Sequence, residues 1–275
     1  AGCDDEKLHK LWEGLGYYSR VRNLKKAAQV ILAQHGGVFP ADYEAVRALP
    51  GIGDYTAGAV CSIAFSLPTP AVDGNVLRCL ARLRSDAEAI DLPQVKKRVR
   101  QELEAIYPAD CPGEFTQALM ELGATVCVPN GEPKCDLCPC RAVCPGDWKH
   151  YPVKLPKKPK KQENRTVFIL RCGDRYAIEK RPARGLLAGL WQFPNESGHL
   201  EAAEAVLWAE NRGLHPKNVE RSIDRHHIFT HIRWDMRGWF LEVDAPAGGF
   251  DWLTLEEIDE QAALPTAFRQ FREEI

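Results

Sequence analysis

The first half of the chain places apolar residues at helical spacing and separates them by short breaks that contain glycine or proline. Between Ser19 and His35, apolar side chains recur as on one face of a helix, and we expect them to form core: Val21, Leu24, Ala28, Ile31 and Leu32. The same pattern predicts helices over residues 4–13, 43–48, 57–65, 75–83, 95–107 and 112–126. Because no segment before residue 148 alternates like a strand, residues 1–147 are predicted to form an all-α domain.

Beyond residue 165 the apolar residues follow the alternation of β-strands. Strands are predicted over residues 166–171, 175–180, 226–234 and 237–243, and helices over residues 200–211, 255–261 and 267–274. Residues 166–275 are therefore expected to form a second, α+β domain. The segment between the two, residues 148–165, contains three prolines and six lysines and few apolar residues, which predicts a linker.

The stretch from Leu49 to Val60 predicts a tight hairpin between two helices. Asp42 is expected to cap the first helix and Asp54 the second, while Gly51 and Gly53 allow backbone angles that a side chain would forbid. The amides of a glycine-rich turn that opens a helix point outward together, and the helix dipole adds partial positive charge. The hairpin could therefore bind a phosphate without a basic side chain. A helix-turn-helix used only for packing would show the same spacing.

A further polar segment, Val72-Asp73-Gly74-Asn75, begins shortly after this hairpin, with Asp73 eighteen residues beyond Tyr55. An aspartate between apolar residues and directly before a predicted helix most often caps that helix. By itself, the sequence around Asp73 therefore indicates a cap.

Cysteines are concentrated in one loop at the end of the helical half. Five of the ten cysteines lie between Cys127 and Cys144, a clustering that favours a metal site in a reducing compartment over a disulfide framework. Gaps of seven, two and five residues separate the four that can close a four-thiolate site: Cys127, Cys135, Cys138 and Cys144. Zinc and an iron–sulfur cluster both suit such ligands. Cys140 is a fifth thiol that could compete.

The overall charge does not indicate a nucleic-acid-binding protein. The formal net charge is −2, and the residues before Trp148 include 16 Lys and Arg against 19 Asp and Glu. Any contact with DNA must come from local basic patches and backbone amides. Two patches qualify, residues 20–26 and 149–161. No stretch is long and apolar enough for a membrane span, so we expect no membrane partner.

Four motifs, in this order, resemble the adenine DNA glycosylases of the MutY type. They are Trp12-Glu13-Gly14-Leu15-Gly16-Tyr17-Tyr18-Ser19-Arg20, the Val72–Asn75 segment, the four-cysteine loop, and Gly185-Leu186-Leu187-Ala188-Gly189-Leu190-Trp191-Gln192-Phe193-Pro194. The resemblance covers nearly the whole chain. It implies a multidomain protein, with a helix-hairpin-helix glycosylase domain over residues 1–147 and a Nudix-like domain over residues 166–275. The Glu-rich metal box of the hydrolytic Nudix enzymes is missing, so we expect lesion recognition there and no pyrophosphatase.

The resemblance also implies a role for individual residues. It assigns catalysis to Asp73, Asn75 and Tyr55, and a [4Fe–4S] cluster to the four cysteines of the loop 127–144. It assigns DNA contacts to Gly51, Gly53 and Thr56 of the hairpin and to Tyr17 and Arg20, with Tyr17 as a wedge in the base stack. It assigns the reading of 8-oxoguanine to Phe229, Thr230 and His231. Since the related endonuclease III type uses a lysine at the position of Tyr55, a monofunctional hydrolase is expected.

The resemblance also implies a residue that is not found here. The family places its catalytic glutamate in a segment some tens of residues before the Trp-Glu-Gly-Leu-Gly-Tyr-Tyr motif, whereas eleven residues precede Trp12 in this chain. We therefore expect a fragment of a longer protein, and a chain that cannot complete the reaction as given.

The expected function is removal of adenine from duplex DNA in which it is mispaired with 8-oxoguanine or guanine. The expected protein is a monomer in the bacterial cytoplasm, associated with the nucleoid. Two alternatives remain at this point: a truncated lesion-binding module without catalysis, and a glycosylase/lyase of the endonuclease III type.

Overall fold

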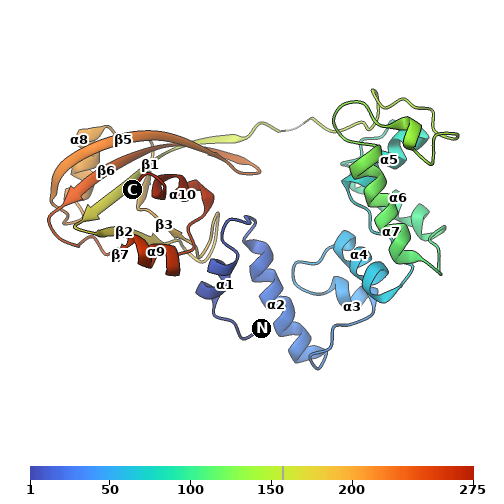
Figure 1. The fold of residues 1–275 in the computed structure, drawn as a ribbon, viewed down its shortest axis with the longest axis horizontal. Helices are drawn as coiled ribbons and strands as arrows, with labels where there is room; N and C mark the ends of the chain where they lie inside the picture. Colours follow the sequence, from blue (N-terminus) through green and yellow to red (C-terminus); the bar gives the residue numbers. More distant parts are fainter. Residues whose placement is uncertain (157) are drawn as a thin grey trace. The chain divides into compact units, whose positions relative to one another are not determined.

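The computed structural model describes residues 1–156 and 158–275, and the chain divides into two compact units. Of the described residues, the first unit contains Ala1 and residues 26–156. The second unit contains residues 2–25 and 158–275. The first unit is helical, and the second contains the sheet (Figure 1). Lys157, part of the predicted linker, lies outside the described residues. No helix among the described residues is both long and apolar enough to cross a membrane.

The helical unit is built from short helices that pack around the face of α5 and α6. Their buried residues form one cluster that includes Val76, Leu77, Val95, Val99 and Leu103. The helix bounds are α3 (Tyr43–Arg47), α4 (Asp54–Phe65), α5 (Gly74–Arg84), α6 (Pro93–Glu104) and α7 (Pro112–Glu121), followed by the π-helical turn η1 (Leu122–Val126) and the 3₁₀ turn η2 (Cys135–Leu137); α2 (Ser19–Gln34) contributes residues to both units. The prediction of an all-α first half is confirmed.

The caps of the two hairpin helices differ from each other. The Asp42 carboxylate accepts the Ala45 N–H at 2.9 Å and caps α3, as predicted. The prediction that Asp54 caps α4 is wrong, because Gly53 occupies the cap position and Asp54 is the first helical residue. The Asp54 carboxylate instead pairs with Arg47 and, at 3.4 Å, with Arg100. Asp54 therefore ties the start of α4 to α3 and α6.

Two predicted features of the helices also change. Val21 is buried, but Leu24 and Leu32 are 58% and 59% exposed, so the prediction that both form core is wrong. The described residues leave that side of α2 uncovered, which periodicity cannot reveal. The helix predicted over residues 112–126 ends as an α-helix at Glu121 and continues as η1. Within η1, a Cβ on Gly123 would lie 2.5 Å from the Asn75 Cβ, so this turn approaches α5 closely.

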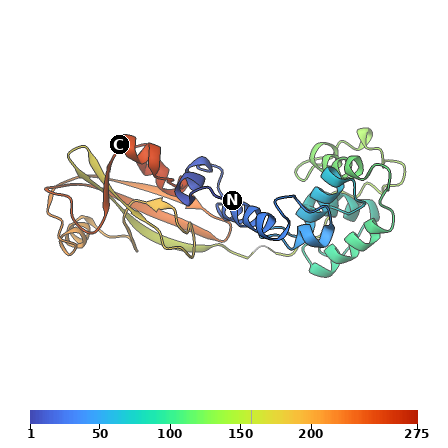
Figure 2. The same cartoon turned by 90° about the horizontal axis from the view of Figure 1, so that it is seen from below.

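The second unit contains one mixed sheet with strand order β3-β2-β1-β6-β5. β1 and β6 are parallel neighbours, while β5 and β6 form a long antiparallel pair (Figures 1 and 2). One core cluster includes Phe268 and Phe271 of α10, and another includes Trp208 of α8 stacked on Phe168. The bounds are β1 (Lys161–Cys172), β2 (Arg175–Lys180), β3 (Trp191–Gln192), β4 (Asn195–Ser197), β5 (Pro216–Ile228), β6 (Ile232–Val243), β7 (Asp251–Thr254), α8 (Ala202–Glu210), α9 (Leu255–Gln261) and α10 (Thr266–Arg272).

Helices and strands in this unit confirm the predicted α+β class, with two corrections. The strand predicted over residues 226–234 is wrong, because β5 ends at Ile228 and residues 229–231 form the turn into β6. Apolar residues at both ends of that turn continue the alternation through it and conceal it. β1 begins at Lys161, inside the predicted linker, because Lys161 pairs with Ile232 of β6.

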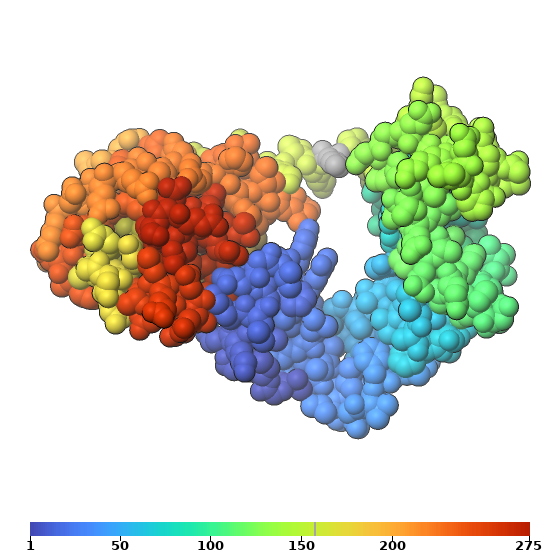
Figure 3. Space-filling model, viewed as in Figure 1, coloured from blue at the N-terminus to red at the C-terminus, as the bar shows by residue number. Residues whose placement is uncertain are grey.

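Residues 2–25, predicted as part of the helical domain, pack on the sheet-containing unit. Glu6 of α1 (Asp5–Leu11) pairs with Lys180 and accepts the Trp191 Nε1–H at 3.0 Å. Glu13 accepts the Leu264 N–H at 2.8 Å, and Arg22 donates to the Ala188 carbonyl at 2.9 Å. In the space-filling view the first residues, in dark blue, adjoin the C-terminal helices, in red (Figure 3). The motif around Trp12 is thereby joined to the motif around Leu190.

Candidate active site

Asp73 stands at the start of α5, where its backbone is extended and its carboxylate caps the helix. One carboxylate oxygen accepts the Val76 N–H at 2.8 Å, and the other accepts the Asn75 side-chain N–H at 2.9 Å. The cap that the sequence suggests is therefore present. These two bonds fix the orientation of the carboxylate at the helix start.

Asn75 is in turn held by a buried arginine. Arg78 is 6% exposed, and its guanidinium donates to the Asn75 side-chain oxygen at 2.9 Å, which directs the Asn75 amide nitrogen toward Asp73. Arg78 also donates to the carbonyls of Gly123 at 2.6 Å and Cys127 at 3.0 Å. A continuous hydrogen-bonded chain thus leads from Asp73 to the first residue of the cysteine loop. Sequence reasoning missed Arg78, although its place one turn after Asn75 was a usable signal.

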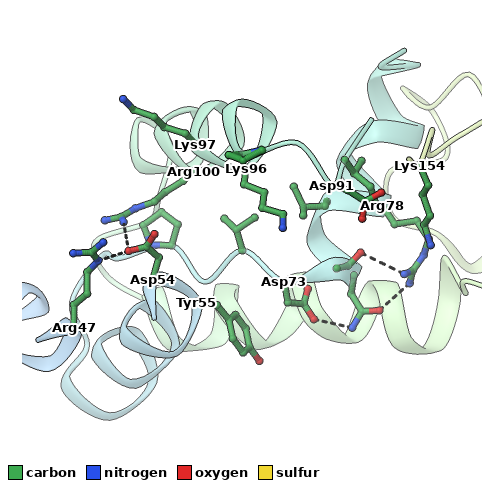
Figure 4. Close-up of a pocket in the computed structure, with 17 residues that line it drawn as sticks. Arg47, Asp54, Tyr55, Asp73, Arg78, Asp91, Lys96, Lys97, Arg100 and Lys154 are labelled. Carbon is green, nitrogen blue, oxygen red and sulfur yellow. Dashed lines mark hydrogen bonds and ion pairs between the residues drawn. The ribbon is translucent and has the colours of Figure 1, made fainter. Parts of the chain in front are cut away.

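A cavity of about 1000 Å³ opens in front of Asp73 (Figure 4). Tyr55, from the first turn of α4, also lines it, is 43% exposed, and donates its hydroxyl to the Met120 sulfur at 3.5 Å. Six basic and three acidic side chains line the cavity, so its wall is cationic although the half of the chain that carries it is not. The basic residues are Arg47, Arg78, Lys96, Lys97, Arg100 and Lys154.

The hairpin lies beside this cavity and keeps its turn exposed. Gly51 has φ +80°, a conformation that favours glycine, and Gly53 is extended at the start of α4. Both glycines and Thr56 are exposed, so the amides at the start of α4 can be reached from solvent. α4 also approaches the segment that leads to Asp73, because Gly58 packs directly on the backbone of Pro70. The hairpin and Asp73 are therefore positioned together.

The four predicted cysteine ligands, Cys127, Cys135, Cys138 and Cys144, line one small cavity together with Arg82 and Trp148, and Cys140 is not part of its lining. Arg82 is buried and donates to the Cys127 sulfur at 3.2 Å and to the Val128 carbonyl at 3.0 Å. Hydrogen bonds from the Cys79 thiol and from Arg82 lower the pKa of Cys127. Among the described residues, no group of three or more His, Cys, Asp or Glu side chains is arranged to hold a single metal ion.

This donor set nevertheless suits a cluster. Four cysteine sulfurs line one cavity, and a buried arginine donates to one of them; four cysteine ligands are what an iron–sulfur cluster requires. In a cubane each thiolate binds a different iron, so the four sulfurs need not converge on a single point as they do around zinc.

A second cavity, of about 550 Å³, lies in the sheet-containing unit and is lined by Tyr17, Phe229, Thr230 and His231. Residues 185–187 complete it, so three motifs that are distant in the sequence meet here. Tyr17 is 64% exposed, has φ +45°, and is stacked by the Arg20 guanidinium at 4.7 Å from the ring centre. Its exposed ring is thus presented by a constrained backbone.

The turn between β5 and β6 is held from two sides. Phe229 packs edge-to-face on Trp234, at 4.9 Å between ring centres, and on His227, at 4.5 Å. Lys160 donates to the Phe229 carbonyl at 2.8 Å, and the Lys161 N–H donates to the His231 carbonyl at 3.0 Å. Phe229 is fixed, whereas Thr230 and His231 are exposed at the tip. Sequence reasoning gave His227 no role, yet it lines this cavity.

The chain is similar to known DNA repair proteins. Residues 1–109 match the HhH-GPD superfamily of base excision DNA repair proteins, and residues 166–274 match the NUDIX domain. Over 98% of its length the chain is 32% identical to an adenine DNA glycosylase of Mus musculus. The chain therefore contains an HhH-GPD domain and a Nudix-like domain, and over most of its length it is similar to adenine DNA glycosylases. An Arabidopsis thaliana adenine DNA glycosylase is 36% identical over 91% of the chain.

The relatives are longer than this chain. It spans 64% of the mouse protein and 45% of the Arabidopsis protein. Among solved structures, a thermostable thymine-DNA glycosylase is 28% identical, with a TM-score of 0.48, and the match covers 54% of this chain and 67% of that one.

Proposed function

We propose that this protein is part of a base excision repair glycosylase that hydrolyses the N-glycosidic bond of adenine mispaired with 8-oxoguanine or guanine in duplex DNA. The observation that carries the proposal is the oriented Asp73 carboxylate in a cavity large enough for a nucleotide. The relatives named adenine DNA glycosylase support the choice of base. Adenine release from a duplex with a single 8-oxoguanine:adenine pair tests it.

The proposed chemistry needs a base that leaves and a sugar that becomes positively charged. Asp73, held by Asn75 and the α5 amide, can stabilise the oxocarbenium ion by its negative charge or by a transient bond to the sugar. Tyr55, which stands where the endonuclease III type is expected to carry its lysine, lines the same cavity but has no amine, so this position cannot form the imine through which such a lyase cuts the strand. We therefore propose a monofunctional hydrolase.

Protonation of the leaving base requires an acid close to Asp73. The only carboxylates among the described residues that line the cavity, apart from Asp73, are Asp54 and Asp91. Asp54 is bound by two arginines, and Asp91 accepts the Leu155 N–H at 3.1 Å. We propose that these 275 residues alone release adenine at least about 10²-fold more slowly than a protein that supplies such an acid. The engagement of Asp54 and Asp91 favours lesion binding without catalysis as the second candidate function of the chain.

We propose that the cysteine loop holds a [4Fe–4S] cluster through Cys127, Cys135, Cys138 and Cys144. Such a cluster, when bound, is a cross-link that braces its loop and can carry an electron. The chain's own contribution is the chain of hydrogen bonds from Cys127 through Arg78 and Asn75 to Asp73, which couples the loop to the carboxylate.

The chain should purify with about four irons per molecule and a brown colour, because its four thiolates surround one cavity. Iron and zinc analysis after anaerobic purification measures this. Cys135→Ser should lose the metal, whereas Cys172→Ser, in the other unit, should keep it. One zinc and no iron in the unchanged protein would contradict the cluster.

We propose that the second unit recognises the lesion and does not hydrolyse nucleotides. Glu201 and Glu204, the acids in the region where hydrolytic relatives carry their metal box, are engaged in a capping box at the start of α8. Trp208 of α8 stacks on Phe168 within the core. Recognition is instead assigned to the exposed turn with Phe229, Thr230 and His231 and to the wedge Tyr17 beside the same cavity.

Phe229→Ala should lower the preference for 8-oxoguanine:adenine over guanine:adenine duplexes by roughly tenfold, because aromatic contacts with a base contribute about 1–3 kcal/mol. The ratio of the two dissociation constants measures this preference. His226→Ala is a matched control, since His226 is exposed on the same strand but does not line the cavity. An unchanged ratio in the Phe229 variant would remove the turn from lesion recognition.

A further inference from the structure

The cavity in front of Asp73 contains lysines that form no ion pair with a described residue. Arg47 and Arg100 both pair with Asp54, and Arg78 is bonded to Asn75 and two carbonyls. Lys96, Lys97 and Lys154, in contrast, make no ion pair with any residue that the structure describes. All three are exposed, so their ammonium groups are available to a ligand.

Lys96 is aimed at the cavity. It lies one turn before Arg100 on α6, so both residues follow the same side of that helix. In the close-up its side chain extends into the space between Asp54 and Asp73, whereas that of Lys97 points away from Asp73 (Figure 4). Two neighbouring residues of equal charge are therefore presented in different directions.

Lys154 reaches the same cavity from a different part of the chain. The Ile90 N–H donates to the Val153 carbonyl at 3.0 Å, and the Leu155 N–H donates to Asp91 at 3.1 Å. These bonds hold residues 153–155 against the loop that leads into α6. The position of Lys154 at the cavity wall is thus set by backbone contacts on both sides of it.

The chemistry of the site requires such cations. A nucleotide that enters the cavity brings its negatively charged phosphates toward the carboxylate of Asp73, and like charges at close range repel each other. An unpaired ammonium in the same cavity offsets this repulsion. It also gains more from a phosphate than a lysine already paired with a carboxylate, because no ion pair must first be broken.

We propose that Lys96, assisted by Lys154, binds backbone phosphates of the nucleotide that is brought to Asp73. The inference rests on the proposed function and adds a DNA contact that lies outside the hairpin, the wedge and the lesion-reading turn. Lys96, on the same side of α6 as Arg100, supplies this contact. Lys96 lies outside both basic patches found in the sequence, residues 20–26 and 149–161.

The test is the salt dependence of DNA binding by the 275-residue chain. The dissociation constant for a duplex with a central tetrahydrofuran abasic analogue opposite 8-oxoguanine is measured between 50 and 200 mM salt. Each lost phosphate contact lowers the slope of log affinity against log salt by about 0.9. Lys96→Gln should lower the slope by about this amount and weaken binding several-fold, and Lys154→Gln should act in the same direction.

Lys7→Gln is the control, because Lys7 is also exposed and forms no ion pair with a described residue, but lines neither the Asp73 cavity nor the cavity with Phe229; this variant should leave the slope within about half of one contact of the unchanged chain. A Lys96→Gln slope equal to that of the unchanged chain would overturn the inference and leave the proposed function intact. An equal loss of slope in Lys96→Gln and in the control variant would do the same. Failure of the unchanged chain to bind any duplex would contradict the proposed function together with the inference.

Discussion

Replacing Asp73 with asparagine should slow adenine release by at least about 10²–10³-fold, because it removes the charge that stabilises the developing sugar cation. The expected loss is in the chemical step, since the transition state carries more positive charge than the bound substrate. The measurement is single-turnover adenine release from an 8-oxoguanine:adenine duplex, by the chain joined at its N-terminus to the glutamate-bearing segment that the family resemblance implies.

The fold should survive this change, which makes the result interpretable. Asparagine is as good a helix cap as aspartate, so the bond to the Val76 N–H can be kept. The bond from the Asn75 amide to the second oxygen can be lost without unfolding α5, because Arg78 still holds Asn75. Equal thermal stability and equal DNA affinity, with a rate near that of the unchanged protein, would exclude Asp73 as the charge that assists catalysis.

Replacing Gly58 with alanine should destabilise the helical unit by at least about 2–3 kcal/mol. A Cβ there would lie 2.7 Å from the Pro70 carbonyl carbon and closer still to its oxygen, and backbone atoms cannot turn aside as a flexible side chain can. Gly58 is buried, and its carbonyl already accepts the Ser62 and Thr69 hydroxyls, so α4 has little freedom to shift. Urea unfolding followed by helical circular dichroism measures the loss.

Gly74→Ala provides the opposite expectation at a matched site. Gly74 is the first residue of α5, its φ is not positive, and nothing lies within 4 Å of a Cβ built on it. Alanine there should leave stability unchanged or raise it by up to about 1 kcal/mol. If both variants unfold at the same urea concentration, the close approach of α4 to the segment before Asp73 is not what stabilises this unit.

The sequence predicts those parts of the fold that depend on local signals. The helical and strand periodicities give the two classes of structure correctly, and Asp42 caps α3 because a capping carboxylate needs only its own helix. Asp54 shows where this reasoning fails. Asp54 is also an aspartate at a predicted helix start, but it forms ion pairs and does not cap the helix. Gly53 occupies the cap position, and Arg47 and Arg100 from other helices lie close enough to pair with Asp54.

The sequence predicts those site residues that are close together within one motif. It does not predict site residues that are distant in the sequence and meet only in the folded protein. Asp73 and Asn75 are two residues apart, so their hydrogen bond follows from local geometry. Lys96 and Lys154 reach the Asp73 cavity only through the packing of α6 and of residues 153–155, which no spacing in the sequence encodes. The turn with Phe229 was concealed for a related reason, because its apolar neighbours continue the strand pattern across it.

Adenine release is the most direct test of the proposed function. The chain extended by the glutamate-bearing segment is mixed in excess with a duplex carrying one 8-oxoguanine:adenine pair, and free adenine, strand cleavage and borohydride-trapped adduct are measured together. We expect adenine release, an uncleaved abasic strand and no trapped adduct, with the 275-residue chain at least about 10²-fold slower because Asp54 and Asp91, the other carboxylates that line the described cavity, are already bonded to arginines and to a backbone amide. Trapped adduct with strand cleavage, or no release of adenine by the extended protein, would contradict a monofunctional adenine glycosylase built around Asp73.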